Sequence, residues 1–206
     1  MDAEQGSLRT AAVIAAAGAS RRMGQCKALL EWRGQPAATV VVQRLMQVRA
    51  SPIVCVVGPQ RGEIEAALAH LPAQIAYNAA HATGGLLGSY QAGIRALQAH
   101  PGLHGALLAL VDQPHVPPSV YQALLQRANN KPQCVIRTSF QGRYGHPFYM
   151  PARLWDTLLR WPARQTMRDF LHAHRADLDE VQVESDAILH DLDTPQDYER
   201  LLARFT

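Results

Sequence analysis

The sequence predicts an α/β protein with three α/β/α layers, in which helices cover both faces of a mostly parallel, Rossmann-like sheet. Short apolar runs alternate with longer amphipathic stretches, and this alternation repeats four times between residues 11 and 129. Such alternation is typical of successive β-α units, because a buried parallel strand is apolar throughout and its covering helix is apolar on one side only.

The four expected β-α units make up the first part of the chain. Each pairs a strand with the helix that follows it: 11–17 with 36–49, 53–57 with 63–70, 75–77 with 86–99, and 106–111 with 118–129.

The second part of the chain is less regular. Strands are expected at 133–138, 145–150 and 181–183, and helices from residue 151, at 164–174 and after Pro195. Thr194 followed by Pro195 is a typical helix start, because threonine caps the first turn and proline fits its backbone angles. With no internal repeat, linker or low-complexity segment, we expect one domain over residues 1–206, with residues 1–9 flexible.

Composition excludes several classes of function. Hydrophobic residues make up 48% of the chain and charged residues 18%, which is typical of an ordinary globular core. The net charge is only +3 and the basic residues are scattered, so we do not expect a nucleic-acid partner. Cys26, Cys55 and Cys134 lack the paired spacing of a zinc or redox site and are expected to be buried free thiols. The chain shows neither a signal peptide nor a membrane-spanning run, so we expect a cytoplasmic protein.

A loop that contains two glycines and three cations follows the first strand. Residues 18–27 read Gly-Ala-Ser-Arg-Arg-Met-Gly-Gln-Cys-Lys. Loops after parallel strands lie at the carboxyl edge of the sheet, where small residues let backbone N–H groups approach phosphate oxygens. The spacing fits neither the Walker loop nor the dinucleotide-binding motif. The alternative is an ordinary turn with solvated cations.

Two acidic segments are candidates for a metal site. Asp112 ends the apolar fourth strand, at the same edge of the sheet as the glycine loop, where it could hold Mg²⁺ against phosphate oxygens. Asp191 and Asp193 flank Leu192, so in an extended segment both would project to one face and could approach one cation. Turn or helix capping is the alternative role for Asp112, Asp193 and Asp197.

These segments resemble the motifs of the MobA-like nucleotidyltransferases, especially the molybdenum cofactor cytidylyltransferases. The matching stretches read A-A-A-G-A-S-R-R-M-G-Q-C-K at 15–27, L-V-D-Q-P at 110–114 and D-L-D-T-P-Q-D-Y at 191–198. The resemblance implies a fold of the nucleotide-diphospho-sugar transferase type and a loop that wraps the triphosphate of an NTP. It also implies catalytic roles for Arg22, Lys27 and Asp112, with Asp112 and Asp191 or Asp193 holding Mg²⁺. The nucleotide-binding residues that it implies are Ala16, Ala17, Gly18, Ser20, Arg22, Lys27, Asn78 and Ser89.

The acceptor side of the resemblance is less complete. The turn at 145–147 resembles the G-H-P turn that this family places over the acceptor, so His146 and Arg168 are expected to bind it. Leu87 and Gly88 stand where the family typically has serines, and residues 163–168 keep only Arg168 of the usual G-D-x-G-x-R. Both departures leave the identity of the acceptor open.

We therefore expect a Mg²⁺-dependent enzyme that moves an NMP, with CMP favoured, from an NTP to a phosphorylated acceptor such as the molybdopterin cofactor. Ala17 favours CTP, because the guanylyl-transferring branch tends to have glycine there. Transfer of the product to a molybdoenzyme or its chaperone fits this expectation. The alternatives are a nucleotidyltransferase for a sugar phosphate or small phospho-acid, and a noncatalytic nucleotide- or pterin-binding module.

Overall fold

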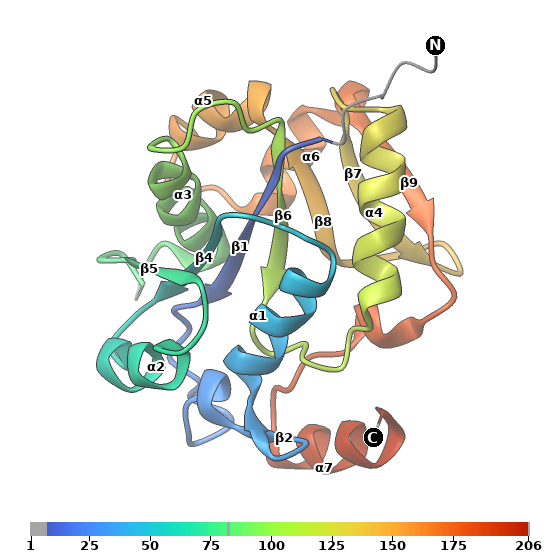
Figure 1. The fold of residues 1–206 in the computed structure, drawn as a ribbon. Helices are drawn as coiled ribbons and strands as arrows, with labels where there is room; N and C mark the ends of the chain where they lie inside the picture. Colours follow the sequence, from blue (N-terminus) through green and yellow to red (C-terminus); the bar gives the residue numbers. More distant parts are fainter. Residues whose placement is uncertain (1–7, 82, 206) are drawn as a thin grey trace.

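A seven-stranded sheet lies at the centre of the molecule (Figure 1). We describe a computed structural model, which covers residues 8–81 and 83–205. The strands, in their order across the sheet, are β5 (Ala73–Tyr77), β4 (Ile53–Val57), β1 (Thr10–Ala16), β6 (Gly105–Leu110), β8 (Arg143–Pro151), β7 (Val135–Phe140) and β9 (Leu178–Gln182). Among these, β8 alone runs antiparallel to its neighbours, and the other pairs are parallel.

Helices cover both faces of the sheet. On one face lie α1 (Ala37–Gln47), α2 (Arg61–Leu68) and α4 (Pro118–Asn130), and on the other α3 (Gly85–Leu97), α5 (Trp155–Leu159) and α6 (Met167–Ala173). A hydrophobic core lies on each face of the sheet, and alternate residues of β1 pack into one or the other. Ala12 and Ile14 face α1, and Ala11 and Val13 face α3. The predicted three-layer, mostly parallel fold is confirmed.

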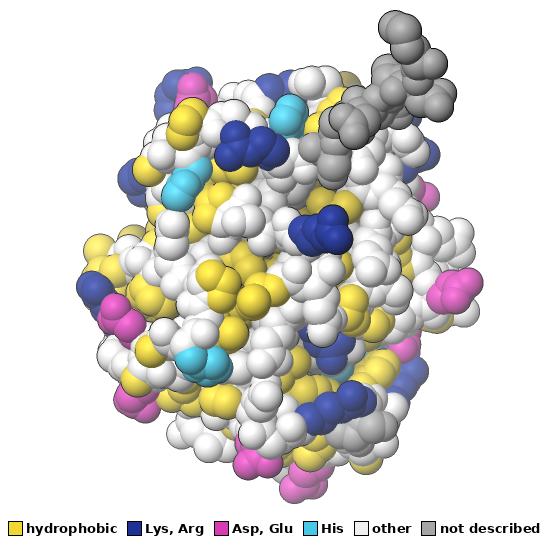
Figure 2. All heavy atoms as spheres, in the orientation of Figure 1, with side chains coloured by type: hydrophobic (Ala, Val, Ile, Leu, Met, Phe, Trp, Pro, Cys, Tyr) yellow, Lys and Arg dark blue, Asp and Glu magenta, His cyan; other side chains and the backbone are white. Residues whose placement is uncertain are grey.

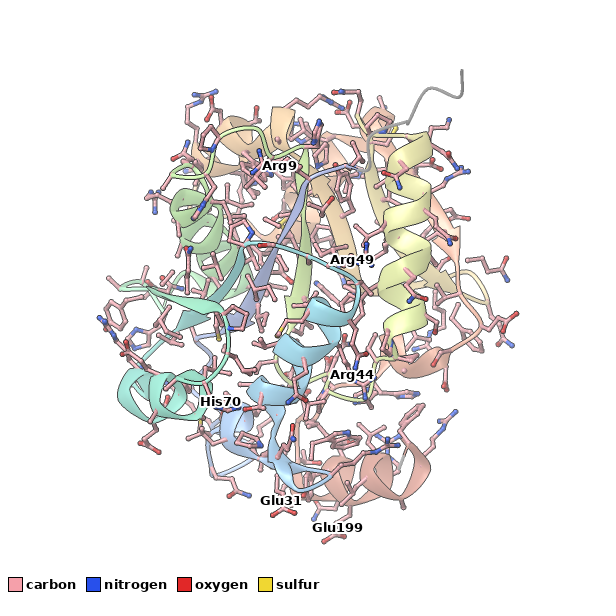
Figure 3. The ribbon with its side chains drawn as sticks, in the orientation of Figure 1. Arg9, Glu31, Arg44, Arg49, His70 and Glu199 are labelled. Atoms are coloured by element: carbon pink, nitrogen blue, oxygen red, sulfur yellow. The ribbon has the colours of Figure 1, made fainter. Side chains whose placement is uncertain are left out.

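The remaining elements are short or lie outside the layers. They are a hairpin of β2 (Glu31–Trp32) and β3 (Gln35–Pro36), the closing helix α7 (Pro195–Phe205), and the 3₁₀ helices η1 (Lys27–Leu29), η2 (Ala152–Leu154), η3 (Arg175–Asp177) and η4 (Asp186–Leu189). The hairpin and α7 meet at one end of the molecule, where Glu31 and Glu199 lie near each other (Figure 3). The hydroxyl of Tyr198 donates to the carbonyl of Glu31 there, at 2.6 Å.

Two helix starts show how local chemistry sets the boundaries. The expected start at residue 164 is wrong, because Thr166 caps α6: its hydroxyl accepts from the amide of Asp169, whose carboxylate accepts from the amide of Thr166. The start at Pro195 is confirmed, and the hydroxyl of Thr194 accepts from the amide of Asp197 at 3.1 Å. The last strand, expected at 181–183, runs over Leu178–Gln182 instead.

Gly93 lets α3 pack closely on the sheet. A Cβ atom at this position would lie 2.2 Å from Cγ1 of Val13 in β1, nearer than real atoms approach. Val13 is β-branched and fully buried, so it has little room to move away. The absence of a side chain at residue 93 therefore sets the distance between α3, which begins at the carboxyl edge of the sheet, and β1, which ends there.

The start of the chain and the surface complete the description. Of residues 1–9, expected to be flexible, 1–7 lie outside the described residues, while the amides of Leu8 and Arg9 donate to side chains of Asn129 and His104. Lys and Arg side chains are scattered over the face shown in Figure 2. No described helix is long and apolar enough to cross a bilayer. All three cysteines are free, as expected, but the expected burial holds for Cys55 alone among them, since Cys26 and Cys134 are partly exposed.

Candidate active site

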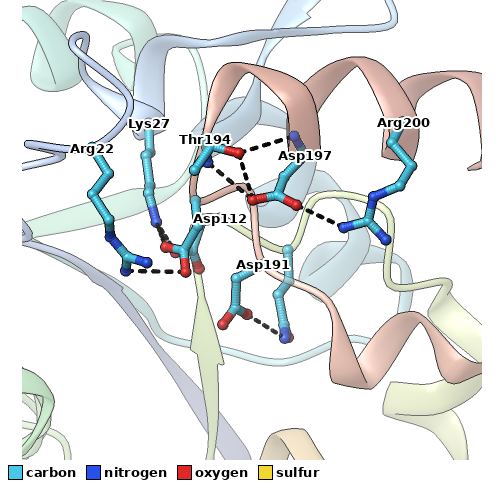
Figure 4. Close-up of polar contacts among 9 residues, drawn as sticks. Arg22, Lys27, Asp112, Asp191, Thr194, Asp197 and Arg200 are labelled. Carbon is cyan, nitrogen blue, oxygen red and sulfur yellow. Dashed lines mark hydrogen bonds and ion pairs between the residues drawn. The ribbon is translucent and has the colours of Figure 1, made fainter.

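Three segments that are remote in sequence meet at the carboxyl edge of the sheet (Figure 4). β1 and β6 are adjacent and parallel, with Ala15 opposite Leu110, so the glycine loop and Asp112 leave the sheet side by side. The amide of Leu192 donates to the carbonyl of Asp112 at 3.0 Å, which ties the C-terminal acidic segment to the same point. The pairing of β1 with β6 and one backbone hydrogen bond therefore bring the three segments into one cluster.

Lys27 lies at the centre of this cluster. Its Nζ donates to Oδ2 of Asp112 at 2.7 Å and to Oδ1 of Asp193 at 2.6 Å. Burial disfavours the charged form of Lys27, but the two carboxylates outweigh this effect and raise its pKa above the usual value. Arg22 adds a second cation, with Nη2 placed 3.0 Å from Oδ2 of Asp193. The cluster therefore sets the side chains of Lys27 and Arg22 against those of Asp112 and Asp193.

Asp191 and Asp193 occupy different environments. Leu192 between them is fully buried, whereas Asp193 faces Lys27 and Arg22. Asp191 accepts instead from Nε2 of Gln113 at 2.9 Å, and its removal from water and the nearby charge of Asp112 raise its pKa. Gln113 was not expected to contribute to the site. Its position directly after Asp112 is the sequence feature from which this contribution could have been predicted.

The glycine loop is folded back on itself by its own backbone bonds. The amides of Met23 and Gly24 donate to the carbonyl of Ser20, and Gly24 takes a φ of 75° that glycine adopts without strain. The hydroxyl of Ser20 accepts from the amide of Lys27 at 3.1 Å. The loop, together with Ala16, Gly18, Asp112 and Asp193, lines a hollow of about 190 Å³.

A second hollow, of about 320 Å³, adjoins the first and shares Gly18 and Asp112 with it. Ala17 and Ser89 line it, whereas Asn78 does not. The Asn78 side chain is buried and donates to the hydroxyl of Ser89 at 3.3 Å, so it orients Ser89. Leu87, one of the departures from the family pattern, is buried in the core rather than exposed in this hollow.

His146 and Arg168 lie together in a third, larger hollow of about 740 Å³, which shares Leu86 with the second. Burial lowers the pKa of His146 to about 4, so its ring is neutral at physiological pH. Its Nε2 has no hydrogen-bond partner in the part of the chain that the structure describes. Arg137, Tyr144 and Arg175 also line this hollow and were not expected from the sequence.

Carboxylate oxygens of Asp112 and Asp193 lie within hydrogen-bond distance of the same nitrogen of Lys27, so they can approach one small ion. No group of three or more His, Cys, Asp or Glu side chains that could hold a metal occurs among residues 8–81 and 83–205. Mg²⁺ is commonly held by one or two carboxylates while substrate phosphates complete its oxygen shell. The donor set therefore fits a magnesium ion that arrives with a triphosphate.

Comparisons with known proteins identify the family of this chain. Residues 12–178 match the family model described as the MobA-like NTP transferase domain. The chain belongs to this family. It is 27% identical to the molybdenum cofactor cytidylyltransferase of Escherichia coli over 195 residues, which cover 94% of this chain and 96% of the relative.

Solved structures share the fold of this family member. A nucleotidyl transferase from Methanothermobacter thermautotroptrophicus superposes with a TM-score of 0.79 at 24% identity, covering 97% of this chain and 98% of the other. Rv0371c from Mycobacterium tuberculosis superposes with a TM-score of 0.78 at 24% identity, covering 96% of this chain and 100% of the other, and has also been solved in complex with manganese. The family membership makes the chain a nucleotidyltransferase-type protein.

Proposed function

We propose that this protein transfers CMP from CTP to a phosphorylated acceptor, such as the molybdopterin cofactor, with release of pyrophosphate. One observation carries the proposal: the Lys27 ammonium is held between Asp112 and Asp193 beside the glycine loop. The second hollow connects this point to the third hollow, which contains His146 and Arg168. The name of the Escherichia coli relative supports the choice of CTP and of molybdopterin.

The reaction joins two phosphates. An oxygen of the acceptor phosphate forms a bond to the α-phosphorus of CTP while the bond from that phosphorus to the β-phosphate oxygen breaks. Several negative charges approach one another, so cations and alignment are the main requirements. The acceptor oxygen carries no proton at neutral pH, so no general base is needed.

The residues of the first hollow meet these requirements. Backbone amides of the glycine loop can approach the β- and γ-phosphates, as small residues permit. Lys27 and Arg22 neutralise the charge that grows on the leaving pyrophosphate. Ser89, oriented by Asn78, lines the adjoining hollow where the nucleoside would extend.

Asp112 and Asp193 would hold Mg²⁺, with Asp191 close behind as a further carboxylate. When bound, Mg²⁺ would supply charge neutralisation and polarise the α-phosphate. The manganese complex of Rv0371c supports a divalent ion in a protein of this fold.

A thermal-shift panel of CTP, GTP, ATP and UTP, with and without Mg²⁺, tests the nucleotide, since a ligand at about a hundredfold its Kd adds roughly 2.7 kcal/mol to stability. We expect the largest shift with CTP and Mg²⁺ together. A pyrophosphate-release assay with CTP and molybdopterin tests transfer. A noncatalytic module would bind nucleotide yet release no pyrophosphate, and a preference for another acceptor would show as release with sugar phosphates instead.

A further inference from the structure

The third hollow carries more positive charge than the expected acceptor residues supply. Three guanidinium groups line it, from Arg137, Arg168 and Arg175, with His146 and His172 beside them. No Asp or Glu is among its lining residues in the described chain. Like charges that share a cavity repel one another, and an anionic ligand relieves this repulsion. The floor is apolar, formed by Leu86, Phe148 and Met167, so the ligand combines an anionic group with an apolar or aromatic body.

Arg137 differs from the arginines that are neutralised by an aspartate. Arg127, Arg153, Arg200 and Arg204 each form an ion pair with an aspartate. Arg137 forms no ion pair with a described residue, although Glu180 lies beside it in register on β9. Its Nε is buried and has no hydrogen-bond partner among the described residues. A buried donor of this kind is costly unless a ligand satisfies it.

Tyr144 fixes the position of Arg137. The guanidinium carbon lies 3.6 Å from the centre of the Tyr144 ring, within the range of a cation–π contact. The two residues come from neighbouring strands, β7 and β8, which are joined by a tight turn at Gln141 and Gly142. Tyr144 is itself 50% exposed, so its ring is not needed to fill the core. Arg137 and Tyr144 thus form one wall of the hollow, and their contact orients the guanidinium before any ligand binds.

We propose that Arg137 is a specificity-determining residue that contacts an anionic group of the acceptor, and that Tyr144 is the residue that positions it. The proposal rests on the proposed function, because it assigns the third hollow to the acceptor. It assigns to this chain an acceptor contact beyond His146 and Arg168. Acceptors that lack a negative charge at the position of Arg137 are then poor substrates.

Steady-state kinetics with molybdopterin and CTP provide the first test. Arg137→Gln should raise the KM for molybdopterin about tenfold or more while the KM for CTP changes by less than about twofold. Arg137→Lys should recover only part of the loss, because lysine keeps the charge without the planar fork. Tyr144→Phe should behave like the wild type, whereas Tyr144→Leu should lose part of the affinity. Arg143→Gln, on the same hairpin but outside the hollow, is the matched control.

A binding measurement that needs no turnover provides the second test. Side-chain NMR signals of His146 and His172 should shift on titration with inorganic phosphate, and Arg137→Gln should weaken this binding about tenfold while Arg143→Gln does not. Calorimetry would establish that each variant folds. If phosphate leaves the wild-type signals unchanged, or shifts them equally in Arg137→Gln, the assignment of Arg137 is overturned. If no acceptor supports transfer but phosphate binds through Arg137, the proposed function fails and the anion site stands.

Discussion

At the level of single residues, Lys27 has the most consequential environment in the candidate site. It is the one lysine placed between two carboxylates, since the other, Lys131, ends α4 on the surface. Its charge holds Asp112 and Asp193 together, which would otherwise repel each other. The same nitrogen is therefore both a structural counter-ion and a candidate contact for the triphosphate.

Lys27→Ala and Asp112→Asn should each lower the rate of nucleotidyl transfer by a factor on the order of 10²–10³, because each removes a preorganised charge from the reaction centre. Pyrophosphate release under single-turnover conditions would measure the loss. Lys131→Ala is the matched control and should leave the rate unchanged. Wild-type rates in Lys27→Ala and Asp112→Asn would remove both residues from the mechanism.

His115 should make stability depend on pH. It is buried, its ring stacks on Phe205, and its Nε2 bonds to the carbonyl of Ala187. Burial lowers its pKa to about 4. Because the unfolded state binds the proton first, the contribution of His115 to the unfolding free energy should fall as pH decreases from about 6.5 toward 4, by roughly 2 kcal/mol between about pH 7 and 5. His146, whose pKa burial also lowers to about 4, should add a similar loss.

Urea unfolding of the wild type and His115→Gln at both pH values would measure this dependence. The variant cannot take up the proton, so its loss of stability over the same interval should be smaller by about that amount. Equal losses in the two proteins would mean that other groups cause the acid sensitivity.

The residues that could be predicted from the sequence were those with short-range signals. Arg22, Lys27, Asp112 and Asp193 were named from motifs, and the structure brings them together. Arg137 and Tyr144 were missed, because their contact depends on the pairing of two strands across a turn rather than on any local pattern.

At the level of elements, the alternating apolar pattern was sufficient to predict the central strands, because a strand buried on both faces must be apolar throughout. The direction of β8 was not predicted. An apolar run has the same composition whichever way it crosses the sheet, and only its pairing with β6 and β7 decides its orientation. The start of α6 was wrong for a similar reason, since Thr166 was not recognised as its cap.

Gly93→Ala should destabilise the fold by about 1–3 kcal/mol, since its methyl group would overlap Val13 and force α3 away from β1. Denaturant unfolding would measure the change. Gly62→Ala in α2 serves as the control, because no atom lies within 4 Å of the added methyl group. That control should be neutral or stabilising by up to about 1 kcal/mol, as expected for alanine in a helix. A neutral Gly93→Ala would contradict the close packing described here.

At the level of the whole molecule, the candidate site joins an early segment of the chain, residues 18–27, to a late one, residues 191–193. The 191–193 segment is held by the backbone bond from Leu192 to Asp112, and Leu192 packs in one cluster with Met23, Trp32 and Leu201. The resemblance of three motifs to one family predicted that these segments share a site. The contacts that bring them together, which run through β1, β6 and the start of α7, become visible only in the assembled sheet. A local sequence pattern gives no information on the distance in space between residues 18–27 and 191–193.

Binding of Mg²⁺ and CTP should therefore protect these two segments together. Hydrogen exchange followed by mass spectrometry should slow in residues 18–27 and also in 191–201, because both contact the same ligand or one another. CTP with a chelator in place of Mg²⁺ is the control and should give weaker protection. Protection confined to residues 18–27 would show that the acidic segment takes no part in binding.

The reversed direction of β8 has a consequence for how acceptor choice can diverge. Because β8 alone begins at the edge where the parallel strands end, its early residues Tyr144, Gly145 and His146 line the third hollow, which we propose takes the acceptor. Insertions or deletions in the turn between β7 and β8 would reshape the acceptor wall and leave the triphosphate loop intact. If the third hollow takes the acceptor as proposed, changes confined to the β7–β8 hairpin should alter the choice of acceptor without altering the glycine loop.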